Sequence, residues 1–228
     1  MGKNDNGNNG RTELVFVVDR SGSMGGLESD TIGGFNSMLS KQRTIAGECR
    51  VTTLLFDHRI ETLHNHLDIR EVNDLTSRDY WVRGSTALLD AIGLAIDRMI
   101  VTQRHTAAAY RAQHVLFVII TDGYENASHR YSLHQIKQMI TYERERYHWE
   151  FVFLGANIDA EQTAGDFGIS PRCATDFHAD GQGIKASFEA VACAATAVRG
   201  GADLDDLSAP DFLGGVRDDY RSRRRMKR

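Results

Sequence analysis

Three short oxygen-rich stretches contain the residues of this chain that could do chemistry. Asp19, Ser21 and Ser23 lie in DRSGS, Thr86 lies in GSTAL, and Asp122 lies in TDG. Carboxylate and hydroxyl oxygens are hard ligands, which suit Mg²⁺ or Mn²⁺ and suit soft metals poorly. These residue types therefore indicate a site for a divalent cation, provided that the fold brings the three stretches together.

The elements next to these stretches are the ones that would bring them together. A near-continuous apolar strand over residues 13–19 runs into the first stretch, and HVLFVIIT at residues 114–121 runs into the third. The second stretch begins an amphipathic helix over residues 86–100. Strands this apolar are usually covered on both faces, as in parallel sheets, where ligands bind beyond the carboxyl ends of the strands. We therefore expect all three stretches at one edge of a sheet.

Strands and helices alternate along most of the chain. Apolar patterning predicts strands over residues 13–19, 50–56, 60–65, 114–121, 150–155 and 173–177, and helices over 27–43, 69–75, 86–100, 133–146, 160–167 and 184–198. The two runs around Asp57 read as a hairpin. This order predicts an α/β fold: a Rossmann-like three-layer sandwich with a mostly parallel sheet, one antiparallel edge strand and helices on both faces.

The three stretches, in this order and at these places, resemble the metal-ion-dependent adhesion site of a von Willebrand factor A (VWA) domain. The resemblance covers residues 12–200 and is nearer to the compact bacterial or phage members of that family. It implies direct contact of Mg²⁺ or Mn²⁺ with the hydroxyls of Ser21, Ser23 and Thr86. It also implies supporting roles for Asp19 and Asp122, often through water. Gly22 would let the loop turn tightly between the two serines.

The resemblance also implies a function. Neutral hydroxyls leave the cation electrophilic at its open position, which a carboxylate of a partner protein can fill. We therefore expect a metal-dependent protein-binding module that is not an enzyme. Related domains often serve as subunits beside an AAA+ ATPase or in stress-response complexes.

Three other interpretations of the sequence stay open. Any one of the turns could only cap the helix that follows it. The same metal could hydrolyse a phosphoester, although no carboxylate pair or histidine at a motif spacing supplies the base. The pair His64-x-His66 could bind a transition metal, but a solvated strand end is favoured because no third ligand has a recognisable spacing.

Charge and cysteine content bound the remaining possibilities. The last eight residues, RSRRRMKR, hold six basic residues, whereas the other 220 residues hold 21 basic and 31 acidic ones. Residues 221–228 could therefore make the protein a nucleic-acid adaptor, although no aromatic residues are interleaved. Three cysteines without a C-x-x-C pair indicate reduced thiols and a cytoplasmic location. No apolar run is long enough to span a membrane. The expected organisation is a disordered tail over residues 1–11, a domain over 12–200 and a C-terminal tail over 201–228.

Overall fold

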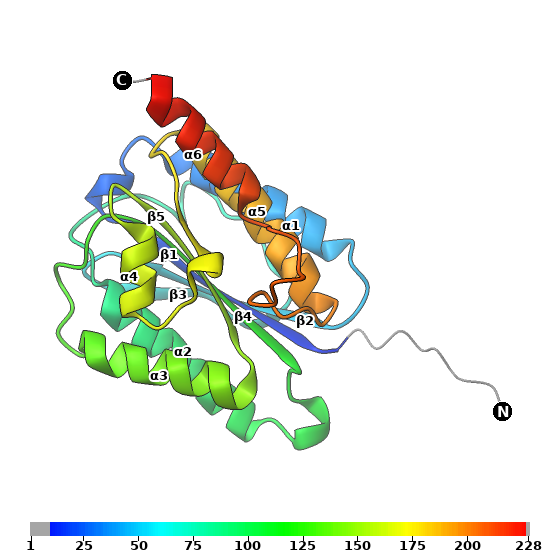
Figure 1. Ribbon diagram of the computed structural model, residues 1–228. Helices are drawn as coiled ribbons and strands as arrows, with labels where there is room; N and C mark the ends of the chain where they lie inside the picture. The colour runs from blue at the N-terminus through cyan, green and yellow to red at the C-terminus, as the bar shows by residue number, and fades with distance from the viewer. Residues whose placement is uncertain (1–9, 227–228) are drawn as a thin grey trace.

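The computed structural model describes residues 10–226 (Figure 1). Most of the tail predicted over residues 1–11 lies outside these residues. Arg11 is attached to the domain, because its guanidinium pairs with Glu48 and donates a hydrogen bond to the carbonyl of Ala109. Among residues 10–226, no helix has both the length and the apolar character that a membrane span requires.

A six-stranded sheet with the order β3-β2-β1-β4-β5-β6 forms the centre of the molecule. All neighbouring strands are parallel except β2 and β3, which form an antiparallel pair at one edge. The strands are β1 (Thr12–Asp19), β2 (Cys49–Phe56), β3 (Ile60–Asp68), β4 (His114–Asp122), β5 (Glu150–Ala156) and β6 (Ala174–Asp176). The predicted fold class is confirmed.

Helices cover both faces of this sheet (Figure 1). The α-helices are α1 (Glu28–Arg43), α2 (Leu88–His105), α3 (Leu133–Tyr147), α4 (Ala160–Asp166), α5 (Gly181–Arg199) and α6 (Gly214–Met226). Helices α2, α3 and α4 lie on one face, and α1, α5 and α6 lie on the other (Figure 1).

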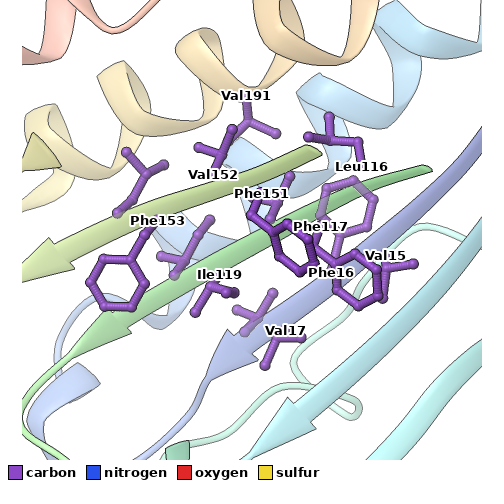
Figure 2. Packing of buried hydrophobic residues seen from close by; sticks show 14 of the residues in the cluster. Val15, Phe16, Val17, Leu116, Phe117, Ile119, Phe151, Val152, Phe153 and Val191 are labelled. Atoms are coloured by element: carbon purple, nitrogen blue, oxygen red, sulfur yellow. The ribbon is translucent and has the colours of Figure 1, made fainter. Parts of the chain in front are cut away.

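The core fills the space between the sheet and each helical layer. Phe117 and Phe151 stack on neighbouring strands with ring centroids 4.8 Å apart (Figure 2). Phe16 lies on the opposite face of the sheet and meets Phe35 of α1 edge to face at 5.3 Å. The two central strands β1 and β4 are buried on both faces, which explains why their sequences are apolar without alternation.

The helix predicted over residues 69–75 is absent. Ile69, Val72 and Leu75 are buried at the spacing of a helix, but side chains of α1 take the hydrogen bonds of this segment. Arg43 donates to the carbonyls of Ile69 and Val72, and the Asn36 amide bonds both the N–H and the C=O of Leu75. Side-chain bonds therefore take the place of helical ones at Ile69, Val72 and Leu75.

The C-terminal tail predicted over residues 201–228 contains a helix that the sequence reasoning missed. Helix α6 packs on α5 and β6, and it buries its own Val216 and the preceding residue Leu213. Arg223 of α6 pairs with Asp180, the residue that caps α5. Only the last part of the basic cluster lies outside the described residues.

Candidate metal site

Asp19 ends β1 and organises the first loop of the site. The residue is fully buried. One carboxylate oxygen accepts the Ser21 backbone N–H at 2.6 Å, and the other accepts the Thr121 hydroxyl at 2.7 Å and the Asp122 N–H at 3.3 Å. Burial raises the pKa of Asp19, although these hydrogen bonds oppose the shift. Because both oxygens are occupied, Asp19 acts mainly by tying the end of β1 to the end of β4.

Ser21 and Ser23 turn back toward each other across a short 3₁₀ turn, Gly22–Met24. Their hydroxyl oxygens lie 3.1 Å apart. Gly22 sits between them and donates its N–H to the carbonyl of Gly84 at 3.1 Å, which ties this loop to the stretch before α2.

Thr86 reaches the same place from the loop before α2. A Cβ atom added to Gly123 would lie 3.3 Å from Ser23 Oγ and 3.8 Å from Thr86 Oγ1. Two hydroxyls from distant parts of the chain therefore converge beside a residue that has no side chain. This cradle, which a single methyl group would fill, has the hard oxygen donors that a small divalent cation requires.

Asp122 completes the set at the end of β4. Asn157 donates a hydrogen bond to one of its carboxylate oxygens, and the other accepts none from residues 10–226. Burial raises the pKa of Asp122, Asn157 opposes the shift, and the neighbouring Asp19 carboxylate adds to it. A cation at the cradle would stabilise both ionised carboxylates. The structure thus gathers all five predicted residues at the carboxyl edge of the sheet.

The oxygen donors of this site favour hard cations such as Mg²⁺ and Mn²⁺ over soft metals. Within residues 10–226, no three His, Cys, Asp or Glu side chains gather closely enough to hold a metal ion. His64 is buried and bonds the Thr53 hydroxyl at 3.0 Å, so the predicted solvated strand end is wrong for this residue. His66 instead lies 2.8 Å from Glu13. These different partners leave His64-x-His66 without a common metal.

Several residues outside the five predicted ones support the site. Tyr80 donates its hydroxyl to the carbonyl of Asp19 at 2.5 Å. Asn126 accepts the Thr86 N–H at 2.8 Å and donates its own N–H to the Thr86 carbonyl. Glu125 accepts the Leu89 N–H at the start of α2. TDGYEN, continuous with the Asp122 stretch, was the available signal for the last two.

Arg20, which fills the variable position of the first stretch, is a fully buried cation. Its guanidinium contacts Asp57 at 3.1 Å and Glu61 at 2.8 Å. Arg83 shares the Asp57 carboxylate at 2.8 Å, and both guanidiniums lie over the Trp81 ring. Burial alone would raise the pKa of Asp57, but the hydrogen bond from Arg83 and the charge of Arg20 hold it below its ordinary value.

His58 follows Asp57 at the same edge of the sheet. Its Nδ1 lies 2.9 Å from the Asp57 carboxylate, and the side chain is 43% exposed. The ring packs against Gly84, where a Cβ atom would meet Nδ1 at 2.2 Å and where φ is +69°. Gly84 is also the residue that receives the Gly22 N–H. An oriented imidazole therefore borders the loops of the candidate metal site.

Comparisons with known proteins bear on the fold. No family model and no curated protein matches the sequence. Among solved structures, the von Willebrand factor domain of the type V pilus tip protein Mfa5 from Porphyromonas gingivalis has a TM-score of 0.56 at 13% identity, covering 82% of this chain and 95% of that one. Manganese-loaded TRAP protein from Plasmodium vivax has a TM-score of 0.53 at 15% identity, covering 78% and 72%.

Proximal thread matrix protein 1 from the mussel byssus gives a TM-score of 0.55 at 14% identity over 82% of this chain. This chain spans 46% of the length of the mussel protein. Another structure of the mussel protein has a zinc-occupied metal-ion-dependent adhesion site. With a mostly parallel six-stranded sheet, helices on both faces and this structural similarity, the chain has the fold of a von Willebrand factor A domain.

Proposed function

We propose that this protein is a divalent-metal-dependent binding module that docks an acidic side chain of a partner protein. The convergence of the Ser23 and Thr86 hydroxyls beside Gly123 carries the proposal. Ser21 lies next to Ser23 in this cradle, and Asp19 and Asp122 hold the two strand ends together. The metals named for the mussel and Plasmodium structures, zinc and manganese, support a divalent cation here, for which we propose Mg²⁺ or Mn²⁺.

The chemistry of the donors explains why a carboxylate is the expected ligand. Three neutral hydroxyls do not cancel the charge of a divalent cation, and both site carboxylates already accept hydrogen bonds. A bound cation would supply an electrophilic centre for an incoming acidic side chain. We further propose a cytoplasmic partner, such as an AAA+ ATPase or a stress-response complex. The three free cysteines, of which Cys49 and Cys173 are buried, support a reducing compartment.

Thermal unfolding with EDTA and with excess Mg²⁺ or Mn²⁺ tests the metal site. At a cation concentration about 100 times the Kd, binding stabilises the native state by about 2.7 kcal/mol. For a domain of this size we expect Tm to rise by roughly 5–10 °C. Ser23→Ala should abolish the rise while preserving the fold, since Ser23 is exposed. Ser37→Ala, an exposed serine within α1, is the matched control and should keep it. An equal rise in both variants would place the cation elsewhere.

Selection from a displayed peptide library tests the docking step. Peptides retained with Mg²⁺ and released by EDTA should each share an Asp or Glu, and its replacement by Asn or Gln should abolish retention. Retention that survives EDTA, or peptides without a shared acid, would contradict carboxylate docking even where the Tm shift is present.

Metal-dependent phosphoester hydrolysis remains a second candidate because of His58. Asp57 orients its Nδ1, which leaves Nε2 for proton transfer near the site. Turnover of p-nitrophenyl phosphate or of a bis-phosphodiester with Mn²⁺, lost in both His58→Asn and Ser23→Ala, would replace the docking proposal. The nucleic-acid alternative for residues 221–228 depends on Arg221 and Arg224, which are exposed, because Arg223 is paired within the chain.

A further inference from the structure

A second candidate site lies at the amino-terminal ends of the strands, whereas the metal site lies at their carboxyl ends. It is a cavity of about 170 Å³ between the C-terminal ends of α2 and α3 and the beginnings of β4 and β5. Val115 and Trp149, which mark those strand beginnings, form part of its wall. A cavity of about 150 Å³ can hold one benzene ring, so this one fits a molecule of that size.

Glu143 of α3 lines this cavity and is its most unusual residue. Only 4% of the residue is exposed. No residue between 10 and 226 donates a hydrogen bond to its carboxylate or forms an ion pair with it within 4.0 Å. Burial raises the pKa of Glu143, and the charge of Arg104 opposes this shift. The carboxylate oxygens are not among the fully buried side-chain atoms of residues 10–226 that lack a partner, so they keep access to the cavity that Glu143 lines. The cavity therefore presents a carboxylate that the ammonium group of a ligand could reach.

Aromatic rings form the walls around this carboxylate. Trp149 is 6% exposed and stacks on Phe117 with ring centroids 5.6 Å apart. Tyr142 and Tyr147 meet edge to face at 6.0 Å, and both remain more than half exposed. Aromatic faces attract cations as well as apolar groups. The walls thus suit an apolar frame that carries an ammonium group.

Two guanidiniums line the same cavity. Arg104 makes no hydrogen bond or ion pair with any residue between 10 and 226. Arg111 uses only its Nε, which donates to the Thr106 carbonyl at 2.9 Å. Free guanidinium N–H groups bind carboxylates, often through two parallel hydrogen bonds. A ligand that was only a cation would be repelled by these two arginines, whereas an acid group on the same ligand would pair with them.

We propose that this cavity binds a small zwitterion, with its ammonium group on Glu143, its acid group on Arg104 or Arg111, and its apolar frame against Trp149 and the tyrosines. The cavity is independent of the metal site, because its residues lie near the amino-terminal ends of the strands and the metal site lies at the carboxyl ends.

Fluorescence titration of Trp81→Phe tests this proposal. The chain has two tryptophans, so this variant leaves Trp149 as the reporter in the cavity wall. The probes are L-leucine, whose charges are adjacent, and 5-aminopentanoate, whose charges are separated. We expect at least one to change the Trp149 emission with a Kd below about 1 mM. The one-charge analogues 3-methylbutylamine and 4-methylpentanoate should bind at least about tenfold more weakly.

Matched variants locate the binding. Glu143→Gln keeps the shape of the side chain and should raise the Kd of whichever probe binds at least about tenfold. The double variant Arg104→Gln and Arg111→Gln should raise it by a similar factor. Glu145→Gln removes an equal charge from the exposed side of α3 and should leave the Kd unchanged. Circular dichroism checks that each variant folds. The proposal fails if neither zwitterion binds at about 10 mM, or if Glu143→Gln and Glu145→Gln bind equally well.

Discussion

At Gly123, the lack of a side chain decides how closely the site hydroxyls approach. Its φ is +150°, and an added Cβ would crowd Ser23 Oγ at 3.3 Å. We predict that Gly123→Ala lowers the free energy of unfolding by about 1–3 kcal/mol through backbone strain and also abolishes the metal-dependent rise in Tm. The measurement is thermal unfolding in EDTA and in excess Mg²⁺.

Gly26→Ala separates these two effects. Gly26 also has a positive φ, +87°, but nothing lies within 4 Å of its Cβ position. The variant should therefore lose stability through strain and keep the metal-dependent rise. If Gly123→Ala still responds to Mg²⁺ as strongly as Gly26→Ala, the cation does not occupy the cradle between the hydroxyls.

The residues of the candidate site divide according to what the sequence could predict about them. Asp19, Ser21, Ser23, Thr86 and Asp122 lie in short local patterns beside strong strand and helix signals. Arg20 does not, because its partner Asp57 follows a different strand. This contact depends on β2 lying beside β1, and strand order is a property of the whole sheet.

Between α1 and α5, two adjacent glycines have opposite surroundings. A Cβ on Gly34 would meet the Phe188 ring of α5 at 2.3 Å, whereas a Cβ on Gly33 would meet nothing within 4 Å. We predict that Gly34→Ala destabilises the protein by about 1–3 kcal/mol, since the two helices must separate. Gly33→Ala should stabilise it by about 0.4–1 kcal/mol through lower chain entropy in the unfolded state.

Urea unfolding of both variants measures the difference. The pair is matched because both variants carry the same Gly→Ala substitution in the same helix, one residue apart. Equal effects of the two substitutions would show that α1 and α5 do not pack as closely as the structure has them.

Elements were predicted well where one apolar pattern decided them and poorly where side chains replaced backbone bonds. Residues 69–75 have a helical apolar spacing, yet Arg43 and Asn36 of α1 bond their backbone. Helix α6 is the opposite case, a helix where a tail was predicted. Its charges resemble a solvated tail, but Leu213 and Val216 are buried and Arg217 donates to the carbonyl of Ala174. In both cases a contact distant in sequence decides the local structure, as propensity alone cannot.

At the scale of the whole molecule, groups with lowered and raised pKa values change the folding stability in opposite directions as pH rises. Hydrogen bonding to Arg223 lowers the pKa of Asp180. The contribution of Asp180 to folding stability is therefore present above its ordinary pKa and is lost as pH falls through the lowered value. Burial, with the nearby Asp203 charge, raises the pKa of Glu150 to about 7. Native Glu150 therefore keeps its proton at pH values where the unfolded chain has released it.

Glu150→Gln should isolate the loss of folding stability that this raised pKa causes as pH rises. Between the ordinary pKa, 4.5, and about 7, the native state binds more protons than the unfolded state, so the free energy of unfolding falls as pH rises. A neutral glutamine removes that dependence. We predict equal stabilities near pH 4.5 and a gain for the variant of about 1–3 kcal/mol near pH ~8, measured by urea unfolding in EDTA. Glu145→Gln, an exposed control, should show no such gain. A constant difference between Glu150→Gln and wild type at both pH values would mean that Glu150 ionises alike in the folded and unfolded chain.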